Sequence, residues 1–207
     1  HSKQGQDYLA AMACAANYAW ANRQMLMHWT REIFTRTLGK SPREVGMRLV
    51  YDVCHNVAKI EKFPLDGQEV ALCVHRKGAT RSFPPGHPDL PERYRSVGQP
   101  VLIPGDMGHG SFVLAGTEQA FQETFGSACH GAGRVMSRSQ ATRISKGRAI
   151  EREMAERGVI VMARGRGTLR EELPEAYKNI DQVVDVVHQA GLARKAARLR
   201  TVGCIKG

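Results

Sequence analysis

Two stretches of the chain repeat apolar residues at the spacing of an α-helix. The apolar positions of the first stretch are Leu9, Met12, Ala16 and Trp20. They predict a long helix over residues 5–28 with one buried stripe, because residues three or four apart share a helical face. The apolar positions of the second stretch are Ile180, Val183, Val184 and Val187. They predict a helix in the last part of the sequence, and Gly191 is placed to close it.

Alternating apolar and polar residues predict several short strands. Leu49, Tyr51 and Val53 alternate with polar neighbours, which indicates a half-buried strand that ends at Cys54. Further strands are expected over residues 70–75, 101–103 and 112–115. Residues 78–91 contain Pro84, Pro85, Pro88 and Pro91. That density of prolines predicts a loop, since proline lacks the N–H that a helix or a central strand needs.

Two more helical regions complete the predicted elements. A helix is expected over residues 117–125, with Thr117 as its N-cap, and a charged helical region over residues 139–157. Strands and helices interleave without an internal repeat. The pattern therefore predicts an α+β fold in which mixed sheets are flanked by helices.

The charge balance adds a candidate partner to this picture. The 207 residues are enough for one domain or part of a larger one, and their formal net charge is +10. This excess favours a polyanion such as a nucleic acid, although a basic surface without a ligand would have the same composition. Five cysteines without CxxC spacing argue against a disulfide framework and favour a reducing, cytoplasmic setting. We see neither a membrane-spanning stretch nor a signal peptide in the sequence.

Familiar nucleotide-binding motifs are absent. Gly39-Lys40-Ser41 has the ending of a phosphate-binding Walker A loop, but Phe34 stands where its first glycine belongs. There is also no GxGxxG after a predicted strand, and no HExxH or GxSxG. If the protein binds a nucleotide, it must do so with residues outside these motifs.

Two polar segments at the ends of predicted strands are candidates for a nucleotide or metal site. In residues 51–56 the predicted strand delivers His55 and Asn56 to its tip, where an imidazole can ligate a metal or simply bond to the backbone. In residues 104–111 three glycines let backbone amides converge on an anion, and Asp106 could accept the donor groups of a guanine edge. The same glycines would also suit a plain connection between strands.

The segment Cys129-His130-Gly131-Ala132-Gly133-Arg134 carries the third pattern. Imidazole can act as a nucleophile at phosphorus, and a nearby arginine can hold non-bridging oxygens and stabilise the developing charge. A buried Cys-His pair at a turn is the alternative for this segment. A basic run that includes Arg76, Lys77 and Arg81 is a candidate track for RNA phosphates or, alternatively, a solvated face.

Several of these segments together resemble the RtcB family of RNA-splicing ligases. The resembling segments are 51–59, 75–85, 129–134, 175–179 and 205–207. They occur in order, within a match that runs from about Gly5 to the last residue. The resemblance implies that residues 1–207 are the C-terminal half of one larger catalytic domain. The N-terminal half, which carries the other metal ligands in the family, would then be a missing partner.

The resemblance also implies an activity, namely a GTP- and Mn²⁺-dependent RNA ligase of tRNA splicing and RNA repair. It would join a 2′,3′-cyclic phosphate or 3′-phosphate end to a 5′-hydroxyl end, with tRNA halves as substrates. His130 would carry the guanylate, His55 would ligate Mn²⁺, and Tyr177 would stack on the base. The expected nucleotide-binding residues are Asn56, Gly105, Asp106, Met107, Ser111, Gly131, Ala132, Gly133, Arg134, Tyr177 and Lys206.

Two alternatives remain open at this point. The chain could be a non-catalytic RNA-binding or accessory fragment of such a ligase, inactive without its N-terminal half. It could also be a truncated product that exposes core surface and mainly aggregates or assembles.

Overall fold

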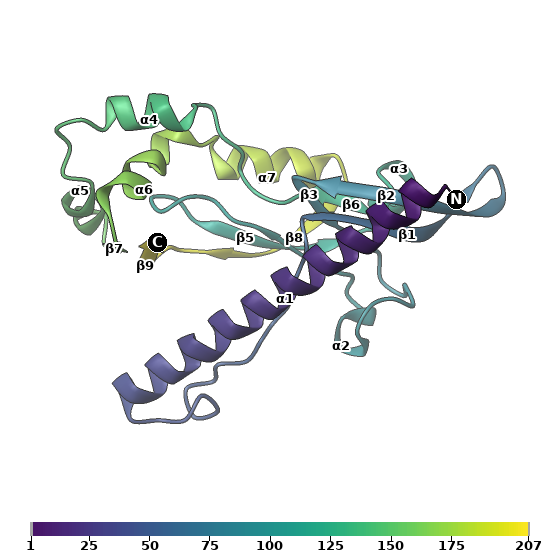
Figure 1. The fold of residues 1–207 in the computed structure, drawn as a ribbon, viewed down its shortest axis with the longest axis horizontal. Coiled ribbons are helices and arrows are strands. Elements are labelled where there is room, and N and C mark those ends of the chain that lie inside the picture. The colour runs from purple at the N-terminus through teal and green to yellow at the C-terminus, as the bar shows by residue number, and fades with distance from the viewer. Residues whose placement is uncertain (1, 207) are drawn as a thin grey trace.

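The computed structural model describes residues 2–206, apart from the side chains of Arg166 and Lys206. It is an α+β fold of small sheets and helices, as the sequence predicted (Figure 1). The helix α1 (Lys3–Leu38) begins at Ser2, whose hydroxyl accepts from the Gly5 amide. It ends at Gly39, which has a left-handed backbone with φ 63°. The predicted helix over residues 5–28 is therefore confirmed and is longer at both ends.

The buried stripe predicted for α1 is wrong in this structure. No residue of α1 is buried, and Trp20, one of the four stripe residues, is 44% exposed. The other three stripe residues, Leu9, Met12 and Ala16, are only half-buried. Figure 1 shows that the C-terminal half of α1, which lies beyond the stripe, extends away from the sheets.

The strands of the described residues form four sheets. β1 (Asn56–Leu65) and β2 (Gln68–Lys77) form an antiparallel hairpin, and β3 (Ala79–Arg81) pairs with β6 (Ser127–Cys129). The third sheet is antiparallel, with the order β4 (Pro100–Ile103), β5 (Ser111–Gly116) and β8 (Ala193–Leu199). The fourth pairs β7 (Ile160–Ala163) with β9 (Gly203–Lys206) in parallel. The predicted strands at 70–75, 101–103 and 112–115 are thus confirmed within β2, β4 and β5.

The strand predicted to end at Cys54 is wrong. Residues 47–54 form no strand, and β1 begins only at Asn56. The carbonyl oxygens of Leu49 and Val50 accept hydrogen bonds from the side chains of Arg93 and Tyr94, not from a neighbouring strand. His55 and Asn56 consequently lie at the start of a strand instead of at its end.

The proline-rich region is largely irregular, as predicted. The short strand β3 precedes its first proline, and the one-turn helix α2 (Glu92–Arg95) follows its last. The helix predicted over residues 117–125 is α3 (Glu118–Glu123), and Thr117 caps it by accepting from the Ala120 amide. The predicted helical region 139–157 consists of two helices, α4 (Arg138–Ile144) and α5 (Ile150–Glu156). Gly147, with φ 80°, lies in the turn between them.

The last part of the chain holds α6 (Arg166–Glu171), the 3₁₀ turn η1 (Pro174–Ala176) and α7 (Ile180–Gln189). The Asn179 side chain caps α7 by accepting from two backbone amides, and Gly191 follows with φ 70°. The helix predicted from the second apolar stripe is therefore confirmed. Among residues 2–206, no helix combines the length and apolar character needed to cross a membrane.

Three separate apolar clusters form the interior. One joins the β4–β5–β8 sheet to α7 through residues such as Val101, Leu114 and Val184. A second, around Met154 and Leu173, packs α5 and α6 against β7 and includes Met107. The third lies under the β1–β2 hairpin and is built from Phe63, Phe83 and Leu90. The 104–111 turn connects β4 to β5 and inserts Met107 into the second cluster, so it bridges the first two clusters.

Candidate functional site

His55 and His130 form a stacked pair at the meeting of three segments. His55 precedes β1 and His130 follows β6, and their ring centroids are 4.5 Å apart with an interplanar angle of 4°. The Gly78 amide donates to the His55 carbonyl at 3.0 Å. Gly78 has φ 75°, and a Cβ there would lie 3.7 Å from the His130 ring. The tight turn between β2 and β3 therefore holds the two histidines together.

The environment of His130 favours its neutral, nucleophilic form. Burial lowers the pKa of His130, and the neighbouring charge of His55 lowers that pKa further. A neutral imidazole keeps a nitrogen lone pair available for attack on phosphorus. Burial raises the pKa of the adjacent Cys129 thiol, which disfavours the thiolate. Of these two neighbours, the imidazole is the better nucleophile.

A pocket of about 380 Å³ lies at the 104–111 turn and Tyr177, and we refer to it as the Tyr177 pocket. Its lining residues are Gly105, Asp106, Met107, Ser111, Glu172, Tyr177, Leu199, Arg200, Thr201, Val202, Gly203 and Cys204. These come from three segments that are far apart in the sequence. Five of the residues expected to bind a nucleotide are brought together here, namely Gly105, Asp106, Met107, Ser111 and Tyr177. Its volume and its mixture of apolar and polar groups are those of a small-molecule site.

The 104–111 turn is built by close backbone contacts. A Cβ on Gly105 would lie 2.1 Å from the Gly110 carbonyl oxygen, so the two ends of the turn meet only because Gly105 lacks a side chain. The Asp106 carboxylate, 1% exposed, accepts from the Gly108 and His109 amides at 2.8 and 3.1 Å. The same carboxylate pairs with His109 Nδ1 at 2.8 Å. Its use for a guanine edge would therefore compete with these contacts.

Arg134 orients Tyr177. Its Nη1 donates to the Tyr177 hydroxyl at 3.0 Å, and its guanidinium lies 4.9 Å from the centroid of the Tyr177 ring. Arg134 also donates to the Glu171 carbonyl oxygen at 2.6 Å and pairs with Glu172 at 3.4 Å. Burial raises the pKa of Tyr177, and its hydrogen bond to Glu172 raises that pKa further. The predicted contact of Arg134 with phosphate oxygens would require some of these bonds to be released.

The glycine-rich segment after His130 connects the histidine pair to the Tyr177 pocket. The Ala132 amide donates to the Pro104 carbonyl at 3.1 Å, and the Lys178 amide donates to the Gly133 carbonyl at 2.9 Å. A backbone bridge also joins Arg134 to Tyr177. His130, Gly131 and Asn56 are not among the residues that line the Tyr177 pocket. The structure thus joins the segment after the predicted nucleophile to the backbone next to the pocket, while His130 itself does not line it.

The basic run is divided between the interior and the surface. Arg76 is only 2% exposed and pairs with the buried Glu61 at 2.7 Å. It also donates to Ser127 Oγ at 2.9 Å and to the Phe125 carbonyl at 2.8 Å. The expectation that Arg76 contacts RNA is therefore corrected, because its guanidinium is enclosed and its donors are used. Lys77 is exposed and Arg81 is half-buried over the Phe83 ring, 4.6 Å from its centroid.

The described residues do not fit a complete metal site. No group of three or more histidine, cysteine, aspartate or glutamate side chains in this part of the chain could hold a metal ion. His55 can supply one ligand, and a transition metal in a protein needs more than one. The predicted role of Lys206 concerns a side chain outside the described residues, although its backbone belongs to β9.

Sequence reasoning missed one wall of the Tyr177 pocket, formed by residues 199–204. This wall follows β8, whose residues after Ala193 are exposed and read Arg-Lys-Ala-Ala-Arg-Leu. Apolar and polar residues do not alternate along this strand, so the sequence pattern did not predict the strand or the wall that continues from it. Glu172 was also missed, and neither its residue type nor its spacing distinguishes it from the other acidic residues around it.

Comparisons with known proteins give one consistent result. A family model described as tRNA-splicing ligase RtcB matches residues 1–207. The tRNA-splicing ligase RtcB of Archaeoglobus fulgidus is 56% identical over 207 residues, which are 100% of this chain and 43% of that protein. The protein of the same name from Thermococcus kodakarensis is 54% identical over 206 residues, again 43% of its length. In Pyrococcus abyssi the identity is 56% over 206 residues, 22% of that relative. The chain thus spans less than half the length of these curated relatives.

Proposed function

The chain belongs to the tRNA-splicing ligase RtcB family, and from this premise we propose that it forms part of an RNA ligase that acts in the cytoplasm. The ligase would join an RNA end with a 3′-phosphate or 2′,3′-cyclic phosphate to a 5′-hydroxyl end, using GTP and Mn²⁺. Halves of a spliced tRNA are the proposed substrates. The names of the relatives support the RNA ligase activity, and the reaction details are our proposal.

One observation carries this proposal. Five residues expected to bind the nucleotide line a single pocket, and the segment that follows the predicted nucleophile His130 is hydrogen-bonded to Pro104, next to the lining residue Gly105. These residues are separated by up to about 70 positions in the sequence, so only the fold brings them together. In this proposal the guanine lies in the Tyr177 pocket and stacks on the face of Tyr177 that Arg134 does not cover. Arg134 is then a positioning residue for Tyr177.

For an RNA end that carries a 3′-phosphate, the proposed chemistry has three steps; at a 2′,3′-cyclic phosphate end, water would first break the P–O2′ bond to give the 3′-phosphate and a free 2′-hydroxyl. First, an imidazole nitrogen of His130 attacks the α-phosphorus of GTP, a P–N bond forms and pyrophosphate leaves. Next, an oxygen of the RNA 3′-phosphate takes the guanylate from His130, which frees the imidazole. Finally, the 5′-hydroxyl attacks the activated 3′-phosphate, a phosphodiester forms and GMP leaves. The lowered pKa of His130 supports the first step, because the attacking imidazole must be neutral.

The proposed need for Mn²⁺ is not met by the described residues alone. We therefore assign no step to the metal here. His55 remains the proposed contribution of this chain to a site whose other ligands would come from an N-terminal partner segment. This arrangement predicts that the chain by itself transfers no guanylate to His130.

Guanylation of His130 tests the proposal directly. The chain would be incubated with α-labelled GTP and Mn²⁺, alone and mixed with the part of the Archaeoglobus fulgidus relative that it does not match. We expect label that survives denaturation in the mixture, and its loss in His130→Ala. His188→Ala is the matched control, since His188 is exposed near the end of α7, and it should keep the label. Persistent labelling of His130→Ala, or no label in the mixture, would contradict the proposal.

A non-catalytic role is the second candidate, and the incomplete metal site favours it. A fragment of this kind would bind RNA without any requirement for GTP. The labelling experiment separates the two functions, because the accessory role predicts no covalent label even when the partner segment is present.

A further inference from the structure

Three arginines surround a second pocket next to the Tyr177 pocket. This pocket has a volume of about 300 Å³, and we refer to it as the arginine pocket. Arg157 at the end of α5 and Arg198 and Arg200 at the end of β8 line it, together with the 108–110 turn. Resting on the proposed function, we propose that the arginine pocket binds backbone phosphates of the RNA strand that the ligase joins.

Two of the three guanidinium groups, those of Arg157 and Arg200, have no hydrogen-bond or ion-pair partner in the described part of the chain. A Cβ on Gly108 would lie 3.1 Å from Arg157 Nη1, and one on Gly158 would lie 3.2 Å from Arg200 Nη2. Both guanidinium groups therefore lie against glycines, and residues 2–206 offer neither of them a hydrogen bond or an ion pair. Glu153 and Glu175 lie near Arg157, but both carboxylates accept from Arg148. Arg198 has an exposed partner, Asp181, at 3.2 Å.

This arrangement of charge suits a chain of phosphates. Like charges around one cavity repel one another, and a polyanion removes that repulsion while it releases its own counter-ions. The fork of an arginine side chain matches the oxygens of a phosphate. Leu199, Arg200 and Thr201 line both pockets, so the two sites share a wall. An RNA strand held in the arginine pocket would therefore lie beside the proposed nucleotide.

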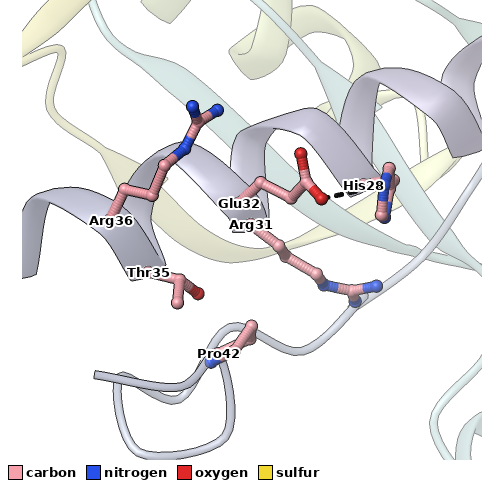
Figure 2. Close-up of a pocket in the computed structure, with 6 residues that line it drawn as sticks. All are labelled: His28, Arg31, Glu32, Thr35, Arg36 and Pro42. Carbon is pink, nitrogen blue, oxygen red and sulfur yellow. Dashed lines mark ion pairs between the residues drawn. The ribbon is translucent and has the colours of Figure 1, made fainter. Parts of the chain in front are cut away.

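A second basic pocket gives a contrast within the same molecule. It has a volume of about 550 Å³ and lies between α1 and the turn that follows it, and we refer to it as the α1 pocket (Figure 2). His28 pairs there with Glu32 at 3.4 Å, so the pocket already contains a carboxylate that offsets part of the positive charge of its lining. Figure 2 shows the Arg31 and Arg36 side chains pointing in different directions. The α1 pocket therefore has two arginines where the arginine pocket has three, and its two arginine side chains do not converge.

The contrast supplies the experiment. Binding of a fluorescein-labelled oligouridylate to the 207-residue chain would be followed by fluorescence anisotropy over a series of salt concentrations. Arg157→Ala/Arg200→Ala removes the two unpaired charges of the arginine pocket. Arg31→Ala/Arg36→Ala removes two charges from the α1 pocket and is the matched control for net charge. All four arginines lie on the surface or close to it, and thermal unfolding would verify that both variants remain folded.

We expect the first variant to bind RNA at least about fivefold more weakly at low salt, while the control stays within about twofold. Its salt slope should also fall by about 1.4, because each lost phosphate contact to a single strand lowers the slope by about 0.7. Equal losses in both variants, or an unchanged slope in the first, would overturn the proposal. Labelling of His130 by GTP is read separately. If RNA binding depends on Arg157 and Arg200 but His130 is never labelled, the pocket stands and the ligase proposal fails.

Discussion

Arg76 is buried in an ion pair with Glu61, although Lys77, its neighbour in the same basic run, is exposed. Both side chains are enclosed, at 5% and 1% exposure, and join adjacent strands β1 and β2. Arg76 also donates to Ser127 at the start of β6 and to the Phe125 carbonyl just before it, so the pair connects the hairpin to the segment that leads to His130. From the sequence, Arg76 was indistinguishable from Lys77 and Arg81. Its role depends on Glu61, which pairs with it only in the folded hairpin.

Glu61→Gln should therefore be strongly destabilising. It leaves the buried Arg76 charge without a counter-charge, which costs about 3–5 kcal/mol when one partner of a buried pair is removed. Urea unfolding followed by circular dichroism would measure the loss. Glu69→Gln is the matched control, because its pair with Lys62 at 2.7 Å is solvent-exposed and should contribute less than about 1 kcal/mol. Similar losses for both variants would show that the Glu61 pair is not buried in solution.

Arg148 should make stability depend on pH. It donates to Glu153 and Glu175, linking α5 to η1. The hydrogen bond from Arg148 lowers the pKa of Glu153. In Glu175 burial raises the pKa, but the hydrogen bond from Arg148, a backbone hydrogen bond and the charges of Arg148 and Arg157 together lower it below its usual value. Because both folded pKa values lie below the unfolded ones, this stabilisation is present above about pH 4.3 and is lost as pH falls further.

Arg148→Gln should consequently unfold more easily than the wild type only when the carboxylates are charged. We expect a loss of about 1 kcal/mol at neutral pH, a modest value because both carboxylates are a third or more exposed. The difference should shrink towards zero in acid, and urea unfolding at several pH values would follow it. A difference that is constant across the pH range would mean that Arg148 acts through packing and not through the two carboxylates.

At the scale of elements, α1 is a long helix that buries none of its residues against the rest of the chain. Its contacts with the rest of the chain include the pair of Arg23 with Asp52 at 2.6 Å, the stacking of Tyr8 on His75 and a cation–π contact of Lys59 with Trp20. Its large exposed apolar residues are Tyr8, Tyr18, Trp20, Met25, Leu26, Trp29, Ile33, Phe34 and Leu38. In contrast, α7 buries Ile180, Val184 and Val187.

Hydrogen exchange should therefore separate these two helices. Local opening costs little where few buried contacts are lost, so the α1 amides should exchange much faster than those at the centre of α7. Peptide-resolved mass spectrometry after exchange in deuterated buffer would show the difference. Equal protection of α1 and α7 would mean that α1 is covered in solution, for example by self-association of the chain, and repeating the experiment at lower concentration would test that.

The contrast between the exposed α1 and the buried face of α7 shows which features could be predicted from the sequence. The spacing of apolar residues located α1 and α7, because periodicity depends only on neighbours along the chain. It could not tell that one stripe is buried and the other is not, since burial depends on what packs against the helix. The strand predicted at 49–53 failed for the same reason, because side chains of Arg93 and Tyr94 occupy its carbonyl groups. For the candidate site, motif resemblance indicated His130 and Tyr177, but not the wall at residues 199–204.

At the scale of the whole molecule, the uncovered α1 and the incomplete metal site lead to the same expectation. In the part of the chain that the structure describes, the interior consists of three separate clusters, and none of them includes a residue of α1. An exposed apolar surface of this extent is typical of an interface. The predicted N-terminal partner segment would cover α1 and bring further metal ligands towards His55. Burial of the apolar face would supply the binding energy, at about 25 cal/mol for each Å² covered.

A charge placed on α1 should then prevent assembly without harming the chain itself. Trp29→Glu changes a side chain that is 50% exposed, so the free chain should keep its unfolding midpoint. In the complex the new carboxylate would be buried without a partner, and we expect at least about tenfold weaker binding, or about 1.4 kcal/mol. Val186→Glu, at an exposed apolar position of α7, is the matched control. Calorimetric titration with the unmatched part of the Archaeoglobus fulgidus relative would measure both, and equal affinities of the two variants would place the interface away from α1.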